Sequence, residues 1–138
     1  MDTGKSALGL DGNVAAALGY PIAIIAIISL IIDKENRFVR FHAMQSVLLL
    51  VVLIVVVIVL TIISVVLGIV LGVAANAAGS AGGIVSLIFS LISLLVWLVI
   101  PLVFLAGLIF AAVKAYGGNS FKLPIIGNMA EKFTGGSA

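Results

Sequence analysis

The chain has 138 residues, of which 64% are hydrophobic and only 9% are charged, and its mean hydropathy is +1.45. These values lie far outside the range of soluble proteins and indicate an integral membrane protein. A net charge of +2 that rests on 7 basic and 5 acidic residues excludes a nucleic-acid interface built on a basic patch. Because cysteine is absent, disulfides, thiolate nucleophiles and thiolate metal sites are excluded as well.

The polar N-terminal segment MDTGKSALGLDGN lacks the basic start of a signal peptide, so we expect the apolar run after it to be retained. A transmembrane helix needs about 20 apolar residues, and three stretches satisfy this requirement. They are residues 14–32, 47–73 and 84–113. The uncharged segment AANAAGSAGG, residues 74–83, predicts a tight loop between the last two stretches. The predicted fold is all-α, with residues 1–138 forming a single membrane domain of three transmembrane helices.

Basic residues near the ends of spans set the orientation, because cytoplasmic loops carry an excess of Lys and Arg. The 33–46 loop and the 114–138 tail are the basic segments, whereas the 74–83 loop carries no charge. We therefore expect the N-terminus outside and both basic segments in the cytoplasm. The expected location is the bacterial inner (plasma) membrane or the corresponding membrane of an organelle.

The 33–46 segment, DKENRFVRFHAMQS, predicts an amphipathic helical segment that leads into the second span. Phe38, Phe41, His42 and Gln45 share one helical face, at the spacing i, i+3, i+4 and i+7. In one interpretation the segment is an interfacial anchor, with phenylalanines at headgroup level and arginines on the lipid phosphates. In the other, its last residues form a polar patch between helices or against a partner. The candidate patch comprises Arg37, Phe38, Arg40, Phe41, His42, Gln45 and Ser46.

Small residues recur along each predicted span at intervals that let helix backbones approach closely. Small residues are also common in membrane helices generally. This composition therefore explains a line of small residues in any one span as well as helix packing does. Three lines together favour a compact bundle. The candidate packing residues are Gly19, Ala23, Ser64, Gly68, Gly72, Ser86, Ser90 and Ser93.

The C-terminal tail begins with Lys114 and Tyr116, a cation and an aromatic residue typical of a membrane anchor. The apolar residues after them are too few to cross the bilayer, so we expect a short surface segment. It would lie along the membrane or against the arginine-containing loop. The sequence NMAEKF predicts a short helix capped by Asn128.

Two segments carry a specific resemblance to a known family. Residues 10–46, which include NRFVRFHAMQS, and residues 113–132, which include FKLPIIGNMAEK, closely resemble small bacterial and archaeal membrane proteins of unknown function. That family is distantly similar to the chloroplast inner-envelope protein-import component of the Tic-twenty type. The resemblance implies membership of a helical membrane family and implies no activity. The import component has four spans, one more than the three predicted here.

The distribution of polar residues argues against an enzyme, because every carboxylate lies outside the predicted spans. No catalytic residue, metal ligand set, cofactor or small-molecule substrate is predicted. The leading hypothesis is a non-enzymatic structural, assembly or accessory subunit of a larger membrane complex. The alternative is a homo-oligomeric translocation or conducting element, lined by the serines of the third span. The expected partners are the lipid bilayer and other membrane proteins or copies of the chain, with no nucleic acid.

Overall fold

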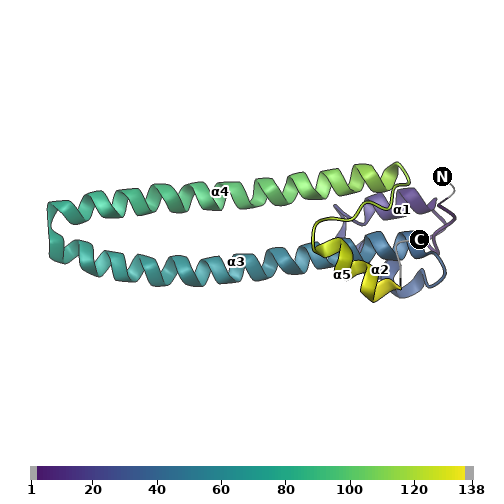
Figure 1. Ribbon diagram of the computed structural model, residues 1–138, viewed down its shortest axis with the longest axis horizontal. Helices are drawn as coiled ribbons and strands as arrows, with labels where there is room; N and C mark the ends of the chain where they lie inside the picture. Colours follow the sequence, from purple (N-terminus) through teal and green to yellow (C-terminus); the bar gives the residue numbers. More distant parts are fainter. Residues whose placement is uncertain (1–2, 136–138) are drawn as a thin grey trace. The chain divides into compact units, whose positions relative to one another are not determined.

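The computed structural model describes residues 3–135, and these residues form an all-α fold (Figure 1). The all-α class predicted from the sequence is therefore confirmed. The chain divides into two compact units. The first, hereafter the polar unit, comprises Met1–Val52 and Leu105–Ala138, and the second, hereafter the hairpin unit, comprises Leu53–Phe104. The helices in chain order are α1 (Gly12–Leu18), α2 (Ala23–Ile32), α3 (Arg37–Ala78), α4 (Ser80–Tyr116) and α5 (Ile126–Thr134).

Two helices, α3 of 42 residues and α4 of 37 residues, are long and apolar enough to cross a membrane. Both extend beyond the predicted spans because nothing between residues 37 and 78 or between 80 and 116 stops a helix, apart from Pro101, which α4 accommodates. The ten-residue loop predicted at 74–83 is wrong. Gly79 alone separates the helices, with φ +62°, a left-handed conformation that glycine adopts at little cost.

The single helix predicted over residues 14–32 is also wrong, since the structure divides it into α1 and α2. Pro21 explains the break, because it has no N–H to donate and disfavours helical geometry at Tyr20 before it. With 7 and 10 residues, both helices are shorter than the roughly 20 residues that a span requires. The three-span arrangement is therefore not confirmed.

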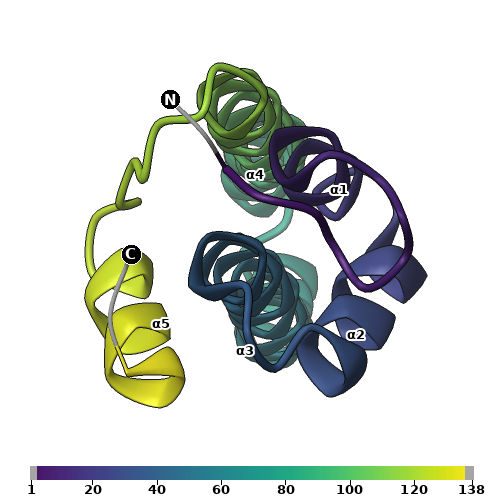
Figure 2. The ribbon, with the colours of Figure 1, turned by 90° about the vertical axis from the view of Figure 1, so that its right-hand side faces the viewer.

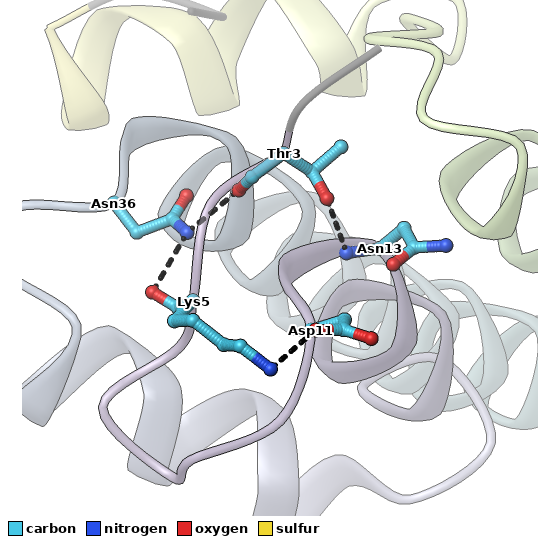
Figure 3. Close-up of polar contacts among 5 residues, drawn as sticks. All are labelled: Thr3, Lys5, Asp11, Asn13 and Asn36. Carbon is cyan, nitrogen blue, oxygen red and sulfur yellow. Dashed lines mark hydrogen bonds and ion pairs between the residues drawn. The ribbon is translucent and has the colours of Figure 1, made fainter.

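The chain reverses direction between α1 and α2, so the segment before α1 meets the segment after α2 (Figure 3). Asn36 donates from Nδ2 to the carbonyl oxygens of Thr3 at 2.9 Å and Lys5 at 3.2 Å. The Thr3 hydroxyl in turn accepts a 3.0 Å hydrogen bond from the backbone N–H of Asn13. Both ends of residues 14–32 therefore lie together instead of a membrane thickness apart.

The core of the polar unit is built from small residues and two aromatic rings. Seen along the polar unit, α1 lies beside the end of α4, and α2 and α5 lie on opposite sides of the first turns of α3 (Figure 2). Alanines let the helices approach closely, and the rings fill the space that remains. The buried core cluster comprises Ala16, Tyr20, Phe38, Ala111 and Ala115.

The hairpin unit has a different surface, because most of its large apolar side chains are exposed. Gly68 on α3 lies opposite Phe89 on α4, whose Cε1 would be 3.9 Å from a Cβ at that glycine position. A side chain at Gly82 would collide with the backbone of Ala75, so this glycine permits the close approach of the helices beside the turn. Polar hydroxyls here bond within their own helix, as Thr61 does to the Val57 carbonyl at 2.7 Å.

The tail after α4 folds back and ends in α5, which is longer than the predicted short helix. Asn128 is not its cap, because α5 begins at Ile126 and Asn128 lies inside it. Glu131 instead forms an ion pair with Lys122 at 2.8 Å. Of the two places predicted for the tail, the structure shows it packed against the start of α3.

Candidate functional site: a buried polar network

His42 is fully buried in the polar unit, and both of its ring nitrogens have partners. Nε2 lies 3.1 Å from the carbonyl oxygen of Asn119, and Nδ1 lies 2.9 Å from the hydroxyl of Tyr20. A carbonyl oxygen can only accept, so Nε2 carries the proton and donates it. Nδ1 is then the acceptor of the Tyr20 O–H, and the ring is the neutral tautomer with a hydrogen on Nε2.

Gln45, one turn further along α3, is also fully buried and connects three segments. Its Nε2 donates to the Tyr20 hydroxyl at 2.7 Å and to the carbonyl oxygen of Phe121 at 3.2 Å. Its Oε1 accepts the backbone N–H of Leu123 at 3.0 Å. A single side chain amide therefore ties α3 to the break before α2 and to the tail.

The hydrogen bonds form a chain with one direction: Gln45 donates to Tyr20, Tyr20 donates to His42, and His42 donates to the Asn119 carbonyl. Each of the three side chains both donates and accepts. Fully satisfied buried networks specify a single arrangement of the segments that they join, since breaking one bond strands its partner. The network therefore fixes the register of the tail on α3.

Ser46 extends the same face to the α1–α2 break. Its hydroxyl donates a 2.8 Å hydrogen bond to the carbonyl oxygen of Gly19, the residue that ends α1. Helix ends leave carbonyls without an intrahelical partner, and in an apolar setting each one needs a donor. Ser46 supplies that donor at the point where α1 ends beside α3.

Aromatic rings surround the imidazole and exclude solvent from it. The ring centroids of Phe38 and Phe41 lie 4.6 and 5.1 Å from that of His42, and Tyr20 lies 5.9 Å away, all in edge-to-face geometry. Such geometry places the positive edge of one ring on the negative face of the other. The low polarity of this enclosure strengthens the His42 hydrogen bonds.

A second polar cluster joins the end of α2 to the segment before α1. Asp33, at the end of α2, is buried and accepts hydrogen bonds from the Ser6 hydroxyl at 2.8 Å and the Ala7 N–H at 2.5 Å. Asp33 and Ser6 also line a cavity of about 400 Å³, together with charged side chains of both signs. Hydrogen bonding to a carboxylate is about twice as strong as between neutral groups, so Asp33 holds the N-terminal loop firmly.

The structure brings five of the seven predicted patch residues together. Phe38, Phe41, His42, Gln45 and Ser46 are buried within the chain, whereas Arg37 is exposed and Arg40 is half-buried. Arg40 donates from Nη1 to the Lys34 carbonyl at 3.5 Å. Helix α3 begins at Arg37, so the predicted segment is helical over residues 37–46 and not over 33–36, and the shared face of Phe38, Phe41, His42 and Gln45 is buried. Whether the patch contacts lipid or a partner stays a prediction.

The predicted packing residues separate into two groups. Half-buried or buried positions are Gly19, Ala23, Ser64, Gly68, Gly72, Ser86 and Ser93, whereas Ser90 is exposed. The Ser90 hydroxyl donates back to the Ser86 carbonyl at 2.8 Å, within α4. At the predicted membrane anchor, the Lys114 ammonium lies 5.5 Å from the centroid of the Phe110 ring, and Tyr116 is largely exposed.

Sequence reasoning missed Tyr20 and the carbonyls of Asn119 and Phe121 as partners of the network, and it missed Asp33 in the second polar cluster. A tyrosine within an apolar run is the one local signal for Tyr20, since a buried phenol needs a hydrogen-bond partner. The carbonyl partners have no signal, because every residue carries one. Within residues 3–135, no three His, Asp or Glu side chains gather to hold a metal ion.

Two proteins of archaea are similar to the chain over almost its whole length. A UPF0132 membrane protein of Methanocaldococcus jannaschii is 34% identical over 135 residues, which cover 95% of this chain and 96% of the relative. A UPF0132 membrane protein of Archaeoglobus fulgidus is 33% identical over 128 residues, which cover 90% and 96%. No protein-family model and no solved structure matches the chain. The similarity to the import component stays a prediction.

Proposed function

Because the chain belongs to the UPF0132 family of membrane proteins, we propose that it is a two-span helical hairpin serving as a structural or accessory subunit of a membrane complex. This role includes no catalytic activity. The apolar surface of the hairpin unit carries the proposal. That surface needs a covering of lipid tails or of other membrane helices.

The most apolar stretches of α3 and α4 are almost entirely unburied. In the most apolar stretch of α3 none of the residues is buried, and in that of α4 only 6% are buried. Leu94 and Leu87 expose 67% and 60% of their surface, and Ile69 exposes 63%. A soluble protein does not present contiguous apolar surface of this kind. In a bilayer the same side chains face lipid tails, which are also apolar.

A two-span topology is supported by the contacts between the N-terminal segment and the segments near residues 36 and 116. Asn13 donates from Nδ2 to the Tyr116 carbonyl at 2.8 Å, and Asn36 donates to Thr3. Segments in direct contact lie on the same side of the membrane. In this proposal α1 and α2 form a re-entrant pair that enters and leaves by one face, a form tolerated where its backbone groups are satisfied.

The distribution of basic residues agrees better with two spans than with three. In the two-span topology all 7 Lys and Arg residues lie on one side, and the turn at Gly79 on the other side has none. The positive-inside rule then assigns the basic segments of the polar unit to the cytoplasmic side of the membrane. In the three-span topology Lys5 lies on the opposite side from the other six.

The buried network supports a structural role over catalysis. Its donors and acceptors are occupied by groups of the chain itself, as in His42 between Tyr20 and Asn119. Catalytic groups instead aim at a space where a reacting atom can sit. In this proposal the network is a clamp that holds the tail and the α1–α2 pair on α3.

The alternative of a homo-oligomeric conducting element rests on the resemblance to an import component and on the serines of α4. Ser86 and Ser93 are half-buried on the side of α4 that packs in the hairpin unit, and Ser90 bonds within its helix. This placement favours packing over the lining of a pore. Leakage from liposomes that disappears when all three serines are replaced by leucine would reverse that preference.

Native mass spectrometry of the protein extracted from its own membrane in mild detergent tests the proposed role. A subunit of a larger complex is expected to appear with different polypeptides at a fixed ratio. A matched extraction of a Leu94→Ala variant, which trims the most exposed leucine of α4, is expected to reduce that ratio if the partner covers this face. Finding only copies of the chain, in both samples, would contradict the accessory role and favour self-assembly.

A further inference from the structure

We infer that the outer face of α5 is a contact for the membrane surface, where Ile125, Met129 and Phe133 enter the boundary between lipid headgroups and acyl chains. The favoured surface is anionic. The inference rests on the proposed insertion of the hairpin unit, and adds a third attachment that neither span supplies. Interfacial helices of this kind have one apolar face and basic residues beside it.

The two faces of α5 are clearly different. Gly127, Ala130 and Thr134 are buried against the rest of the polar unit, one turn or two apart on one side of the helix. On the other side Ile125 exposes 77% of its surface, Phe133 exposes 63% and Met129 exposes 40%. Met129 and Phe133 lie four residues apart and so form a stripe along the helix, and the exposed Ile125 directly precedes the helix.

The orientation of α5 is fixed, so the stripe cannot simply rotate inward. A side chain at Gly127 would lie 2.6 Å from the Lys122 Cβ and 2.9 Å from Oε1 of Gln45. Only glycine permits this approach, and the Leu123 N–H bonds to that same oxygen. The buried network therefore determines which face of α5 points outward.

Ile125 combines two unfavourable features. Its φ is +66°, a left-handed conformation that is a true outlier for a β-branched residue, and its side chain is the most exposed of the large apolar ones in the tail. Backbone strain of this kind persists where surrounding structure enforces it, and it gathers at sites of function. An apolar environment outside the chain would take up the exposed side chain of Ile125.

Charge and continuity favour lipid over a protein partner. Lys132 is exposed beside Phe133, whereas Lys122 pairs with Glu131 and lies against Gly127, on the buried side of α5. Long lysine stems can lie on apolar surface while the ammonium groups reach phosphates. The tail is also joined to the apolar surface of α4, because the Phe121 ring packs edge-to-face on Phe110 at 5.0 Å, and Phe110 is itself about half exposed.

The absence of cysteine makes site-directed spin labelling free of background. Single-cysteine variants Met129→Cys and Phe133→Cys are labelled in the full chain and reconstituted into phosphatidylcholine vesicles with and without phosphatidylglycerol. Asn128→Cys, exposed on the same helix but off the stripe, is the matched control. Accessibility to oxygen and to a water-soluble nickel chelate then gives the depth of each label.

Labels at 129 and 133 are expected to lie about 5–10 Å below the phosphates while the label at 128 stays in water. Shielding from the chelate should increase with phosphatidylglycerol, and Lys132→Gln should remove that increase. Equal chelate accessibility at 128, 129 and 133 would overturn the inference. Shielding of the stripe in native membranes but not in vesicles would overturn it too, since a protein then covers the face.

A further variant, Leu94→Cys, separates failure of this inference from failure of the proposed function. Leu94 belongs to the exposed surface of the hairpin unit. A label there in oxygen-rich lipid, together with water-exposed labels at 129 and 133, refutes the α5 contact and leaves the hairpin intact. A water-exposed label at 94 contradicts membrane insertion of the hairpin unit itself.

Discussion

The polar unit carries all 12 charged residues and the hairpin unit carries none, and the two units are stabilised in different ways. In the polar unit, side chain hydrogen bonds join residues as far apart in sequence as Asn13 and Tyr116. In the hairpin unit, the side chain hydrogen bonds stay within one helix, as at Ser90 and Thr61. The first unit is specified by its own contacts, and the second relies on an environment that covers its apolar surface.

This difference teaches where polar residues matter in a membrane protein of this kind. Lipid gives no hydrophobic driving force between helices, so a compact arrangement needs close packing or hydrogen bonds. His42, Gln45 and Ser46 give such bonds at the point where three segments meet. Substitutions in the polar unit should therefore have larger and more distant effects than those on the hairpin surface.

The largest effect is expected from Gln45→Leu. It leaves the Leu123 N–H and the Phe121 carbonyl without their partner, and each stranded group costs about 1–3 kcal/mol. Amide exchange in the tail, followed by mass spectrometry, should accelerate roughly 30-fold or more for a loss of about 2 kcal/mol. Thr61→Val, which removes a bond within α3 only, is the control. Unchanged exchange in Gln45→Leu would show that the tail is held by other contacts.

The next effect concerns the turn of the hairpin unit. Gly82→Val would place a side chain against the Ala75 backbone and force the helices apart, with an expected cost of about 1–3 kcal/mol. Gly83→Val is the matched control, because nothing lies within 4 Å of a side chain at that position. Unfolding in sodium dodecyl sulfate, followed by the fluorescence of Trp97, measures both. Equal midpoints for the two variants would mean that the close approach at Gly82 does not stabilise the hairpin.

A smaller effect is expected from Ser46→Ala, which removes the donor to the Gly19 carbonyl. The expected loss is about 1 kcal/mol, as for one neutral hydrogen bond. Exchange of the amides between α1 and α2 should accelerate, while exchange in the tail should not. Faster amide exchange in the tail alone would mean that Ser46 acts with the Gln45 network and not at the break between α1 and α2.

The smallest effect is expected from Ser90→Leu, on the exposed side of α4. Its hydroxyl bonds only the Ser86 carbonyl of its own helix, so stability should change by less than about 0.5 kcal/mol. Unfolding in sodium dodecyl sulfate, again followed by Trp97 fluorescence, measures this change. A large loss of stability would indicate that Ser90 contacts another chain in the membrane.

The sequence was sufficient for features that depend on local pattern. The spacing of Phe38, Phe41, His42 and Gln45 predicted a shared helical face, and all four are buried on it. Long apolar runs predicted α3 and α4. These predictions succeed because a helix repeats every 3.6 residues, so its faces can be read from spacing alone.

Features that depend on a single residue or on distant contacts were predicted less well. Residues 14–32 were expected to form one helix, but Pro21 separates two helices, since the reversal is stabilised by Ser46, Asn36 and Asp33 from other segments. The loop predicted at residues 74–83 was too long, because alanine is a strong helix former and Gly79 alone makes the turn. Asn128 was a plausible cap, but the helix begins earlier because the network positions residues 121–123.

The most direct test of the two-span topology is the accessibility of single cysteines to a membrane-impermeant maleimide in intact and permeabilised cells. Leu8→Cys, Glu35→Cys, Asn119→Cys and Ser80→Cys are all at exposed positions. With two spans, the first three should react only after permeabilisation, whereas Ser80→Cys should react in intact cells. Reaction of Leu8→Cys in intact cells, with Glu35→Cys still protected, would place a span between residues 8 and 35 and contradict the two-span topology.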